Sequence, residues 1–434
     1  MEKTDVLVIG GGPAGLAAAI EADKEGAKVL LIEREERLGG ILKQCIHDGF
    51  GLVRFGEKLS GPEYAERFIE EFESRGIACR TQAFVTDLKK RDGGYYVTFV
   101  DRCGVTELFC TALVLATGCR ERTAKQVFIH GTRPAGVFTA GTAQHFVNLM
   151  GEMVTKRCVI LGSGDIGLIM ARRLTLEGAR VLGVYEVKPE PSGLSRNIRQ
   201  CLEDFDIPLY LSHTVTRVFG QERLTGVEVA AVDEKGKPVA GSEQRIDCDA
   251  LILSVGLIPE NEVAEKLEIA LDPATKGPVC DTGFMTGAAG VFSCGNALHV
   301  NDLVDYVSES GELAGRNAAR YSLHVNRKNL REKTVLPNKG EEKAERVKEI
   351  LFEKGEGFQY LVPQKLALQD CNEKVTLYFR SRRTMAAAQL TVRVDGKEVF
   401  RKSYTGLKPP EMQRIKLDPA DWPIRPDSRI CFTL

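Results

Sequence analysis

The chain has 434 residues, a formal net charge of −1, 43% hydrophobic residues and 27% charged residues. These values are typical of a globular protein with about three domains, and they exclude collagen-like and disordered classes. No eighteen uncharged apolar residues follow one another, so we expect no direct membrane insertion. A strand-like run at residues 5–9 leaves no room for a signal peptide, which predicts a cytoplasmic protein.

Twelve cysteines and six histidines raise the question of a disulfide or metal protein. The closest cysteines are Cys103 and Cys110, so no Cys-x-x-Cys occurs, and the histidines show no His-x-His or His-x-x-x-His pattern. Zinc sites, iron–sulfur clusters and redox dithiols use short spacings of this kind. We therefore expect reduced, mostly buried thiols and no metal site.

The charge is unevenly distributed. Residues 325–434 carry 23 basic against 15 acidic side chains, whereas the residues before them carry 36 against 45. A basic region of this kind can bind nucleic acid, but it shows no RNA- or DNA-binding motif and no interleaved aromatic residues. We expect no nucleic-acid partner and interpret the region as a solvated basic domain.

The first predicted elements are a strand at residues 5–9, a glycine-rich turn and a helix at residues 13–24. The turn has the pattern G-x-G-x-x-G. Gly10 permits the tight turn, Gly12 lets a pyrophosphate approach the backbone, and Gly15 lets the helix pack closely on the strand. The pattern predicts a dinucleotide site at the N-terminus of the helix, where free N–H groups and the helix dipole favour an anion.

An acid follows each of two such turns. The next predicted strand, residues 28–32, ends at Glu33, 18 residues after the third glycine, where an acid hydrogen-bonds a ribose. The same glycine pattern recurs 152 residues later, at Gly162, Gly164 and Gly167. Glu186 then follows a strand at residues 181–185.

Each copy also has a later apolar run that ends in glycine, at residues 111–118 and 249–256. These runs are typical of buried parallel strands that stop at a ligand crevice. One glycine-rich turn is weak support for a nucleotide site, but two copies with matching acids and strands are strong support. The sequence therefore predicts an α/β fold with two Rossmann-like dinucleotide-binding domains.

These features resemble the two-dinucleotide-binding flavoproteins of the pyridine nucleotide–disulfide oxidoreductase superfamily, over residues 1–325. The resemblance implies that the first loop binds FAD and the second NAD(H). It also implies that the FAD domain resumes at residues 290–296, where Asn296 replaces the family acid, and continues in a helix over about residues 305–321. An amide at that position still accepts and donates hydrogen bonds. The expected domains are FAD-binding at 1–125 and 280–325, NAD-binding at 126–279, and C-terminal β-rich at 335–434.

The resemblance also supplies the ligand contacts that we expect. The expected FAD contacts are Gly10, Gly12, Pro13, Ala14, Gly15, Glu33, Arg34, Gly39, Gly40, Val85, Thr117, Gly118, Gly295 and Asn296. The expected NAD contacts are Gly162, Gly164, Asp165, Ile166, Gly167, Glu186 and Gly256. Glu186 favours NAD over NADP because a carboxylate repels a 2′-phosphate, although the neighbouring Lys188 softens this preference.

Disulfide reductases of this superfamily carry two cysteines after the segment Gly39-Gly40, whereas this chain has Cys45 alone there. Disulfide reduction is therefore not expected. Cys45 has two interpretations: a residue that forms a sulfenic acid in a peroxidase or oxidase, or an ordinary buried thiol, which is more frequent. Cys45 and His47 are the candidate catalytic residues, with His47 as a proton relay near the flavin or as a simple loop residue.

Three segments make the resemblance more specific: residues 131–144, 296–305 and 360–365. Residues 131–144 are similar to the linker of FAD/NAD-binding subunits in bacterial sarcosine, opine and proline dehydrogenase complexes. The closest likeness is to a group that accompanies anaerobic glycerol-3-phosphate dehydrogenase-like proteins, which the other two segments resemble in particular. Members of that group are thought to pass electrons between NAD and a partner flavoprotein. The resemblance thus implies a partner dehydrogenase or electron-transfer subunit.

The glycine-rich α/β pattern stops after about residue 330. A charged stretch at residues 341–354 predicts a helix, and alternating segments with an Asp395-Gly396 turn predict a β-rich domain. Three arginines beside its first strand are either solvated or recognise an acidic partner or a phosphate: Arg380, Arg382 and Arg383.

Three functional hypotheses follow from these observations. The first is an FAD-dependent, NAD(H)-linked oxidoreductase subunit that exchanges electrons with a partner dehydrogenase. The second is a self-sufficient flavin oxidoreductase acting on a small amine, a 2-hydroxy acid, or a quinone or dye. The third is a scaffold subunit whose nucleotide sites are structural or vacant, and the intact glycines and acids at both sites argue against it.

Overall fold

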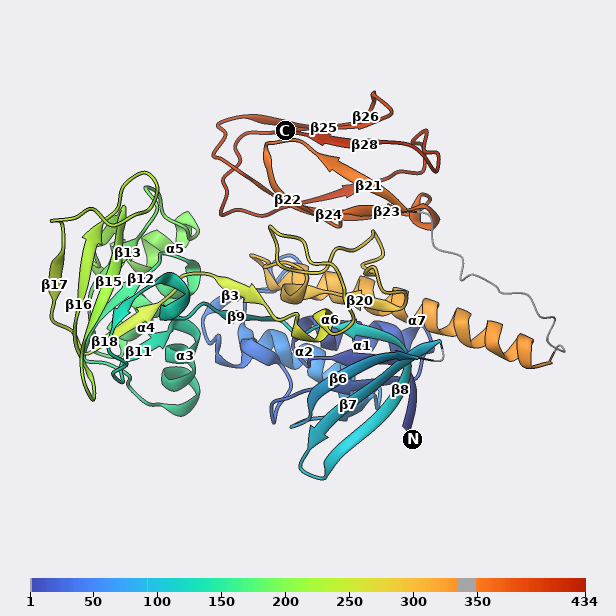
Figure 1. Ribbon diagram of the computed structural model, residues 1–434, viewed down its shortest axis with the longest axis horizontal. Helices are drawn as coiled ribbons and strands as arrows, with labels where there is room; N and C mark the ends of the chain where they lie inside the picture. Colours follow the sequence, from blue (N-terminus) through green and yellow to red (C-terminus); the bar gives the residue numbers. More distant parts are fainter. Residues whose placement is uncertain (1, 92, 335–348) are drawn as a thin grey trace. The chain divides into compact units, whose positions relative to one another are not determined.

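The computed structural model describes residues 2–91, 93–334 and 349–434, with side chains except at 329–334. The chain forms two compact units, the first made of Met1–Cys119 and Pro259–Leu434, and the second of Arg120–Ile258. The chain passes from one to the other within β9 (Cys119–Glu121) and back within β19 (Leu257–Pro259). The first unit thus contains both the first glycine loop and the C-terminal strands (Figure 1).

The central sheet of the first unit has the strand order β5-β2-β1-β8-β7-β6, with β20 also paired to β8. The pairs β1–β2, β1–β8 and β8–β20 are parallel, whereas β6–β7 and β7–β8 are antiparallel. This confirms the apolar runs at 5–9 and 111–118 as buried parallel strands. The strands are β1 (Glu2–Ile9), β2 (Val29–Ile32), β5 (Ala78–Arg80), β6 (Phe84–Arg91), β7 (Gly94–Asp101), β8 (Gly104–Leu115) and β20 (Val291–Ser293).

Two helices pack closely on each other beside this sheet. The predicted helix after the first glycine loop is α1 (Pro13–Lys24), and the helix predicted over 305–321 is longer, because α7 extends over Val304–Thr334. A side chain at Gly311 or Gly315 would overlap the main-chain oxygens of Ala14 and Ala18, so these glycines let the two helices approach. The remaining short elements near the first loop are η1 (Gly40–Gln44), β3 (Asp48–Phe50), β4 (Leu59–Ser60), α2 (Gly61–Ser74), α6 (Glu262–Glu265) and η5 (Gly295–Ala297).

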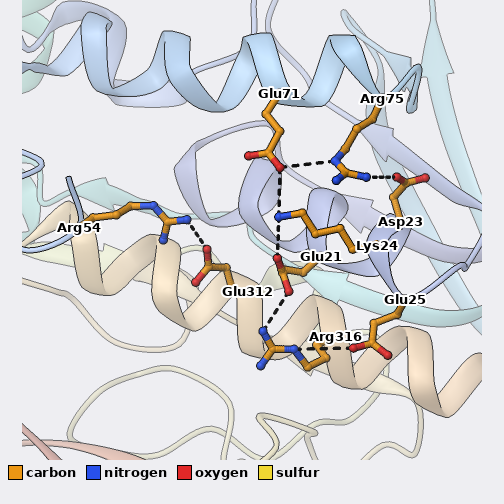
Figure 2. Close-up of polar contacts among 9 residues, drawn as sticks. All are labelled: Glu21, Asp23, Lys24, Glu25, Arg54, Glu71, Arg75, Glu312 and Arg316. Carbon is orange, nitrogen blue, oxygen red and sulfur yellow. Dashed lines mark hydrogen bonds and ion pairs between the residues drawn. The ribbon is translucent and has the colours of Figure 1, made fainter.

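Ion pairs join the exposed faces of these helices. Figure 2 shows that Glu21 of α1 contacts both Lys24 at 3.0 Å and Arg316 of α7 at 2.9 Å, while Lys24 also reaches Glu71 of α2 at 3.1 Å. Exposed pairs of this kind contribute about 0–1 kcal/mol each, so the apolar and backbone contacts hold the helices together. The nine residues of this cluster are Glu21, Asp23, Lys24, Glu25, Arg54, Glu71, Arg75, Glu312 and Arg316.

The second unit contains a parallel sheet with the order β11-β18-β12-β13-β14 and a four-stranded sheet with the order β10-β15-β16-β17. The parallel strands are β11 (Val137–Thr139), β12 (Arg157–Leu161), β13 (Arg180–Glu186), β14 (Leu209–Leu211) and β18 (Ala250–Leu253). The other strands are β10 (His130–Gly131), β15 (His213–Gly220), β16 (Leu224–Ala231) and β17 (Gln244–Ile246), and the helices are α3 (Ala140–His145), α4 (Asp165–Leu176) and α5 (Ser195–Cys201). This unit ends at Ile258, whereas the predicted NAD-binding range runs to residue 279.

The C-terminal part of the first unit consists of two sheets, with the orders β23-β21-β28-β25-β26 and β22-β24-β27. Buried apolar side chains fill the space between them, among them Phe358, Phe379, Val392 and Phe432. The strands are β21 (Glu349–Lys354), β22 (Phe358–Val362), β23 (Lys365–Ala367), β24 (Val375–Ser381), β25 (Ala388–Val394), β26 (Lys397–Tyr404), β27 (Gln413–Leu417) and β28 (Ile430–Thr433).

The helix predicted over 341–354 is wrong where it can be checked. Residues 341–348 lie outside the described residues, and the rest form β21, in which the side chains of Ile350 and Phe352 are buried and those of Glu349 and Leu351 are exposed. This alternation suits a strand that packs one face on the core. Among the residues that the structure describes, no helix is long and apolar enough to cross a membrane.

Candidate functional site

The first glycine loop, between β1 and α1, has no room for side chains at its first and third glycines. Gly10 adopts φ +109°, and a Cβ there would overlap the main-chain oxygen of Ala116. A Cβ at Gly15 would overlap the main-chain oxygen of Gly10. The close packing of strand, turn and helix that the spacing predicts is therefore present, with backbone atoms on both sides.

The second glycine of this loop marks the start of α1. Gly12 is the N-cap, with an extended backbone, and Pro13 occupies the first helical turn. The first N–H groups of a helix have no partner within the helix, and here they follow a residue without a side chain that could cap them. Ala14 lies buried in the same turn. This arrangement fits a pyrophosphate, because the exposed amides and the helix dipole both favour negative charge.

Glu33, at the end of β2, is anchored by both of its carboxylate oxygens. Oε2 accepts a hydrogen bond from the N–H of Gly11 at 2.6 Å, and Oε1 accepts one from the N–H of Glu35 at 2.7 Å. Its side chain is largely buried, so the carboxylate is held beside the glycine loop. Each carboxylate oxygen can accept more than one hydrogen bond, which leaves capacity for a ribose hydroxyl.

The predicted residues Gly39 and Gly40 lie directly over the first loop. The N–H of Gly39 donates to the main-chain oxygen of Gly11 at 2.9 Å, and a Cβ at Gly40 would lie 3.0 Å from the Cα of Gly12. Both residues have positive φ angles, +102° and +56°. Glycine at these two positions lets the η1 segment approach the loop without a side-chain collision.

Other predicted FAD residues meet at Glu260, a residue that belongs to none of the sequence motifs. Thr117 Oγ1 donates to the main-chain oxygen of Glu260 at 2.5 Å, and Arg34 forms an ion pair with the Glu260 carboxylate at 2.8 Å. The N–H of Glu260 donates to the main-chain oxygen of Gly118 at 2.9 Å. Val85 stands apart from this group, buried in β6 opposite Phe99.

Gly295 and Asn296 lie about 280 residues after the first loop in the sequence, and Gly295 packs against that loop. Gly295 adopts φ +61°, and a Cβ there would lie 2.7 Å from the Cβ of Ala14, so η5 packs against the first turn of α1. The N–H of Gly295 donates to Ser310 Oγ of α7 at 2.9 Å. Asn296 Oδ1 accepts a hydrogen bond from the N–H of Asn301 at 3.0 Å. The structure thus brings Gly295 beside Ala14 of the first loop.

The second glycine loop repeats this geometry inside the second unit. Gly162 adopts φ +96°, and a Cβ there would overlap the main-chain oxygen of Ser254. A Cβ at Gly167 would lie 2.6 Å from the Cβ of Ser254, and the N–H of Gly167 donates to Ser254 Oγ at 3.1 Å. Gly164 is the N-cap of α4, as Gly12 is of α1. Gly256 follows β18 with φ +106°.

Glu186 binds its loop in the same way as Glu33. Oε2 accepts hydrogen bonds from Ser163 N at 3.0 Å and Ser163 Oγ at 2.6 Å, and Oε1 accepts one from Lys188 N at 3.1 Å. In both copies, one oxygen holds the amide after the first glycine and the other holds the amide two residues beyond the acid. The duplication predicted from spacing is therefore also a duplication of contacts.

The remaining predicted NAD residues lie in the first turn of α4. Asp165 Oδ1 accepts hydrogen bonds from Leu194 N at 2.9 Å and Asn197 Nδ2 at 2.7 Å, so this carboxylate ties α4 to the start of α5. Ile166 is half-buried against the apolar core of the unit. Ser163 Oγ also accepts from Ser192 N at 2.8 Å. Ser163 and Ser254 are polar partners that the glycine pattern alone did not reveal.

The two candidate catalytic residues differ in character. Cys45 is buried, its Sγ donates to the main-chain oxygen of Ile41 at 3.3 Å, and burial raises its pKa to about 12. A thiol with so high a pKa holds its proton at neutral pH and is a poor nucleophile. His47 is half-buried, contacts the ring of Phe50 and has Nδ1 3.1 Å from the main-chain oxygen of Asp48. Of the two, His47 is the better placed to exchange a proton with solvent.

The geometry agrees with a comparison against known families, in which residues 4–318 match the pyridine nucleotide-disulphide oxidoreductase family. The chain belongs to this family. Two curated relatives are the hydrogen cyanide synthase subunit HcnB of Pseudomonas protegens, 27% identical over 73% of this chain and 68% of its own, and an opine oxidase subunit of Agrobacterium tumefaciens, 26% identical over 74% and 65%. The match thus spans about two thirds of each relative.

Solved structures show the same fold. The thioredoxin reductase of T. acidophilum is 21% identical and covers 74% of this chain with a TM-score of 0.61, and all of that chain is covered. The L-proline dehydrogenase of P. horikoshii covers 76% of this chain with a TM-score of 0.55, over 59% of its own length. The family match ends at residue 318, before the C-terminal strands.

Family membership makes this chain an FAD-dependent oxidoreductase with a nucleotide-binding fold. Its own residues fit the flavin nucleotide, since the first loop, the uncapped start of α1 and the anchored carboxylate of Glu33 lie together. A dinucleotide needs a close backbone approach for its phosphates and an acceptor for its ribose, and these residues provide both.

Proposed function

We propose that this chain transfers hydride between NAD(H), bound in the second unit, and FAD, bound in the first. The duplicated contacts carry the proposal, because Glu186 and Ser163 reproduce in the second unit what Glu33 and Gly11 form in the first. A loop that had lost its nucleotide would not need to keep the carboxylate, the glycines and the open helix start together. A scaffold with vacant sites is therefore the weaker explanation.

NAD(H) is the proposed nicotinamide nucleotide, in preference to NADP. The carboxylate of Glu186 is buried and anchored at the end of β13, where it would accept hydrogen bonds from a ribose diol. The anchored carboxylate would repel a 2′-phosphate at that place, because its hydrogen bonds hold it in position. The Lys188 ammonium, two residues on, reduces this repulsion without removing it.

The residues of the chain divide the work of binding and orientation. Gly12 and the first turn of α1 would receive the pyrophosphate, Glu33 would hold the ribose, and Asn296 would contact the flavin. When bound, FAD supplies the hydride chemistry, so the chain's own task is to align the nucleotides and exclude water. We propose His47 as the residue that exchanges a proton with solvent. Cys45 fits the role of a buried thiol, since its raised pKa opposes nucleophilic use.

We further propose that the chain works with a partner dehydrogenase or electron-transfer subunit. The observation that supports this is the relatives' own names, because HcnB and the opine oxidase relative are both described as subunits of larger enzymes. The two nucleotide loops are the proposed sites of NAD(H) and FAD, and the partner would bring the site for the organic substrate. Electrons from the flavin would then leave to, or arrive from, a second protein.

The test is an anaerobic titration of the purified, yellow protein with NADH, with NADPH in parallel and dithionite as a control for complete reduction. The proposal expects NADH to bleach the flavin band at stoichiometric concentration, and NADPH to require a large excess. Flavin that dithionite reduces but NADH leaves oxidised would overturn the hydride-transfer role. Bleaching by a small amine or 2-hydroxy acid without any partner would instead favour a self-sufficient enzyme.

A further inference from the structure

The loop between η5 and α7 contacts Asn296, a predicted flavin residue, on one side and the C-terminal strands on the other. On the flavin side, Asn296 Oδ1 accepts hydrogen bonds from Asn301 N at 3.0 Å and Asn301 Nδ2 at 3.3 Å. A main-chain N–H can only donate, which fixes the assignment of the amide oxygen. With Oδ1 occupied, the NH2 group of Asn296 is the part left to meet a ligand, and it also lies 3.6 Å from Cys119 Sγ.

From the side of the C-terminal strands, Arg380 of β24 binds the same loop. Its guanidinium forms an ion pair with Asp302, and Nη2 donates to the main-chain oxygen of Val300 at 3.4 Å. The second oxygen of Asp302 accepts from Met412 N at 2.6 Å. Arg380 Nε is itself held by the Tyr360 hydroxyl at 3.1 Å. Val300 and Asp302 are the two neighbours of Asn301, so one arginine holds both flanks of the residue that orients Asn296.

This ion pair is shielded from water, unlike most charge pairs of the domain. The side chains of Arg380 and Asp302 are 14% and 19% exposed, whereas those of Arg429 and Glu353 are 73% and 40% exposed. Partial burial strengthens the electrostatic interaction and makes a half-broken pair costly, so the loop has one strongly preferred position. An exposed pair would hold the same loop only weakly.

We propose that Arg380 is a positioning residue, which sets the orientation of the Asn296 amide at the flavin by holding both flanks of Asn301. The C-terminal domain is then a working part of the flavin site, although it lies beyond the region that the family match covers. The inference rests on the proposed function in one respect, the placement of the flavin beside Asn296. The family residue at this position binds the ribityl chain, and the N-terminus of the following helix α7 favours the reduced, anionic flavin through its dipole. Loss of the amide orientation should displace the flavin from that helix end and make reduction less favourable.

Arg414 provides a matched control in the same domain. It forms a bidentate ion pair with Glu309 of α7, with Nε 2.6 Å from the carboxylate, and it stacks near the ring of Tyr306. It thus ties the C-terminal strands to the same unit without touching residues 296–303. Arg414→Met weakens the attachment of the domain in general, whereas Arg380→Met also releases the loop.

The experiment measures the flavin midpoint potential and the visible circular dichroism of the FAD-loaded full chain. We expect Arg380→Met to make the potential more negative by about 30 mV, which corresponds to a tenfold change in the relative affinity for the two redox states of a two-electron couple. We expect Arg414→Met to leave the potential within a third of that shift. An equal shift in both variants would overturn the inference, because it would show a general effect of domain attachment.

A double-mutant cycle with Asn296→Ala tests whether the effect passes through the amide. The inference expects Arg380→Met to add no further shift once the Asn296 side chain is absent, and additive shifts would contradict it. If Arg380→Met does not fold, Arg380→Lys and Asp302→Asn are measured in its place, with the same sign expected. Wild-type protein that binds FAD but is not reduced by NADH would refute the proposed function while leaving these potentials measurable.

Discussion

The two glycine loops share their backbone geometry but are closed by different means. The first is backed by α7 and η5, because Gly311 of α7 packs against the main-chain oxygen of Ala14 and Gly295 of η5 packs against its side chain. The second has additional side-chain hydrogen bonds: Ser163 Oγ donates to Glu186 and accepts from Ser192 N, and the Asp165 carboxylate accepts from Leu194 N and Asn197 Nδ2. Steric closure by backbone atoms tolerates almost no added volume, whereas each hydrogen bond contributes about 1 kcal/mol and can be removed singly. We therefore expect an all-or-none response in the first loop and a graded one in the second.

The largest expected effect is that of adding one methyl group to each loop. Gly15→Ala places a Cβ on top of the main-chain oxygen of Gly10 in an interior that has no space to yield. We expect this variant to lose bound FAD and to be destabilised by about 3 kcal/mol or more. Flavin absorbance per protein and the thermal midpoint measure the two effects.

Gly167→Ala is the matched change in the second loop, because Gly167 has the place there that Gly15 has in the first. The added Cβ would lie 2.6 Å from the Cβ of Ser254 and 2.8 Å from the main-chain oxygen of Gly162, compared with 1.8 Å from the main-chain oxygen of Gly10 in the first loop. This variant should keep its FAD, bind NADH more weakly, and lose less stability than Gly15→Ala. The steric contrast between the loops is refuted if Gly15→Ala purifies with a full complement of FAD.

These motifs were predictable because their causes are local. A positive φ and a missing Cβ are properties of single residues, so the spacing of Gly10, Gly15 and Glu33 already indicated the turn, the helix start and the ribose acid. The partners of these residues were not predictable. Glu260 meets Arg34 from 226 residues away, and Arg380 meets Asp302 from 78 residues away.

The charge pattern led to a wrong prediction where local signals conflicted. The charges of residues 341–354 suggested a helix, but the alternation of Ile350 and Phe352 within β21 matches the core of two sheets that are completed only by residues after 375. Helix α7 continues past Tyr321 to Thr334, because no glycine or proline interrupts it there. Tertiary contacts and the absence of a stop signal decided these elements, and neither is visible in a short window.

His299 follows η5, which packs against the first loop, and its main-chain N–H donates to the main-chain oxygen of Gly295 at 3.2 Å. Its imidazole is buried against the rings of Tyr360 and Tyr378, and burial together with the charge of Arg380 lowers its pKa to about 3. Between pH 6.5 and pH 3 the unfolded chain therefore binds more protons than the folded chain, so acid lowers the free energy of unfolding, by at most about 5 kcal/mol. His299→Phe should remove this loss in denaturant titrations at pH 7 and pH 5.

A histidine on the exposed surface is the control for that measurement. His130, exposed at the start of β10, can be replaced by Phe without removing a buried imidazole. We expect His130→Phe to keep the wild-type difference between pH 7 and pH 5. If His299→Phe also keeps it, the imidazole is not held neutral and this part of the first unit is not sensitive to acid.

Asp281 gives the first unit a dependence of opposite sign. Its Oδ1 accepts from Gly283 N and Met285 N, both at 2.9 Å, and burial raises its pKa from 3.8 to about 7. The folded chain then holds a proton that the unfolded chain releases, so stability is lost as the pH rises from 3.8 to 7, by at most about 4 kcal/mol. Asp281→Asn should be more stable than wild type at pH 8 and close to it at pH 4. Equal differences at the two pH values would show that Asp281 ionises normally.

The smallest expected effect is an exchange that makes the second loop resemble the first. Ser163→Gly removes the hydroxyl that donates to Glu186 at 2.6 Å and accepts from Ser192 N at 2.8 Å, but it keeps the amide that also holds Glu186. We expect NADH to bind about three- to tenfold more weakly, because the Glu186 carboxylate loses one of its two hydrogen bonds to Ser163, while FAD content stays unchanged. Thr175→Ala, which removes a hydroxyl bonded to Ala171 within α4, is the control for general damage to the helix.

Introducing the serine of the second loop into the first loop tests whether the two loops respond differently to the same exchange. Gly11→Ser would place a Cβ 2.5 Å from a methyl carbon of Leu38 and 3.1 Å from the carboxylate of Glu33. Leu38 can move only by giving up part of its packing against the core, so we expect this variant to lose FAD affinity by more than the Ser163→Gly variant loses NADH affinity. Equal losses in the two exchanges would mean that the loops respond alike. The side-chain hydrogen bonds of the second loop and the close packing of the first would then have the same consequence for nucleotide binding.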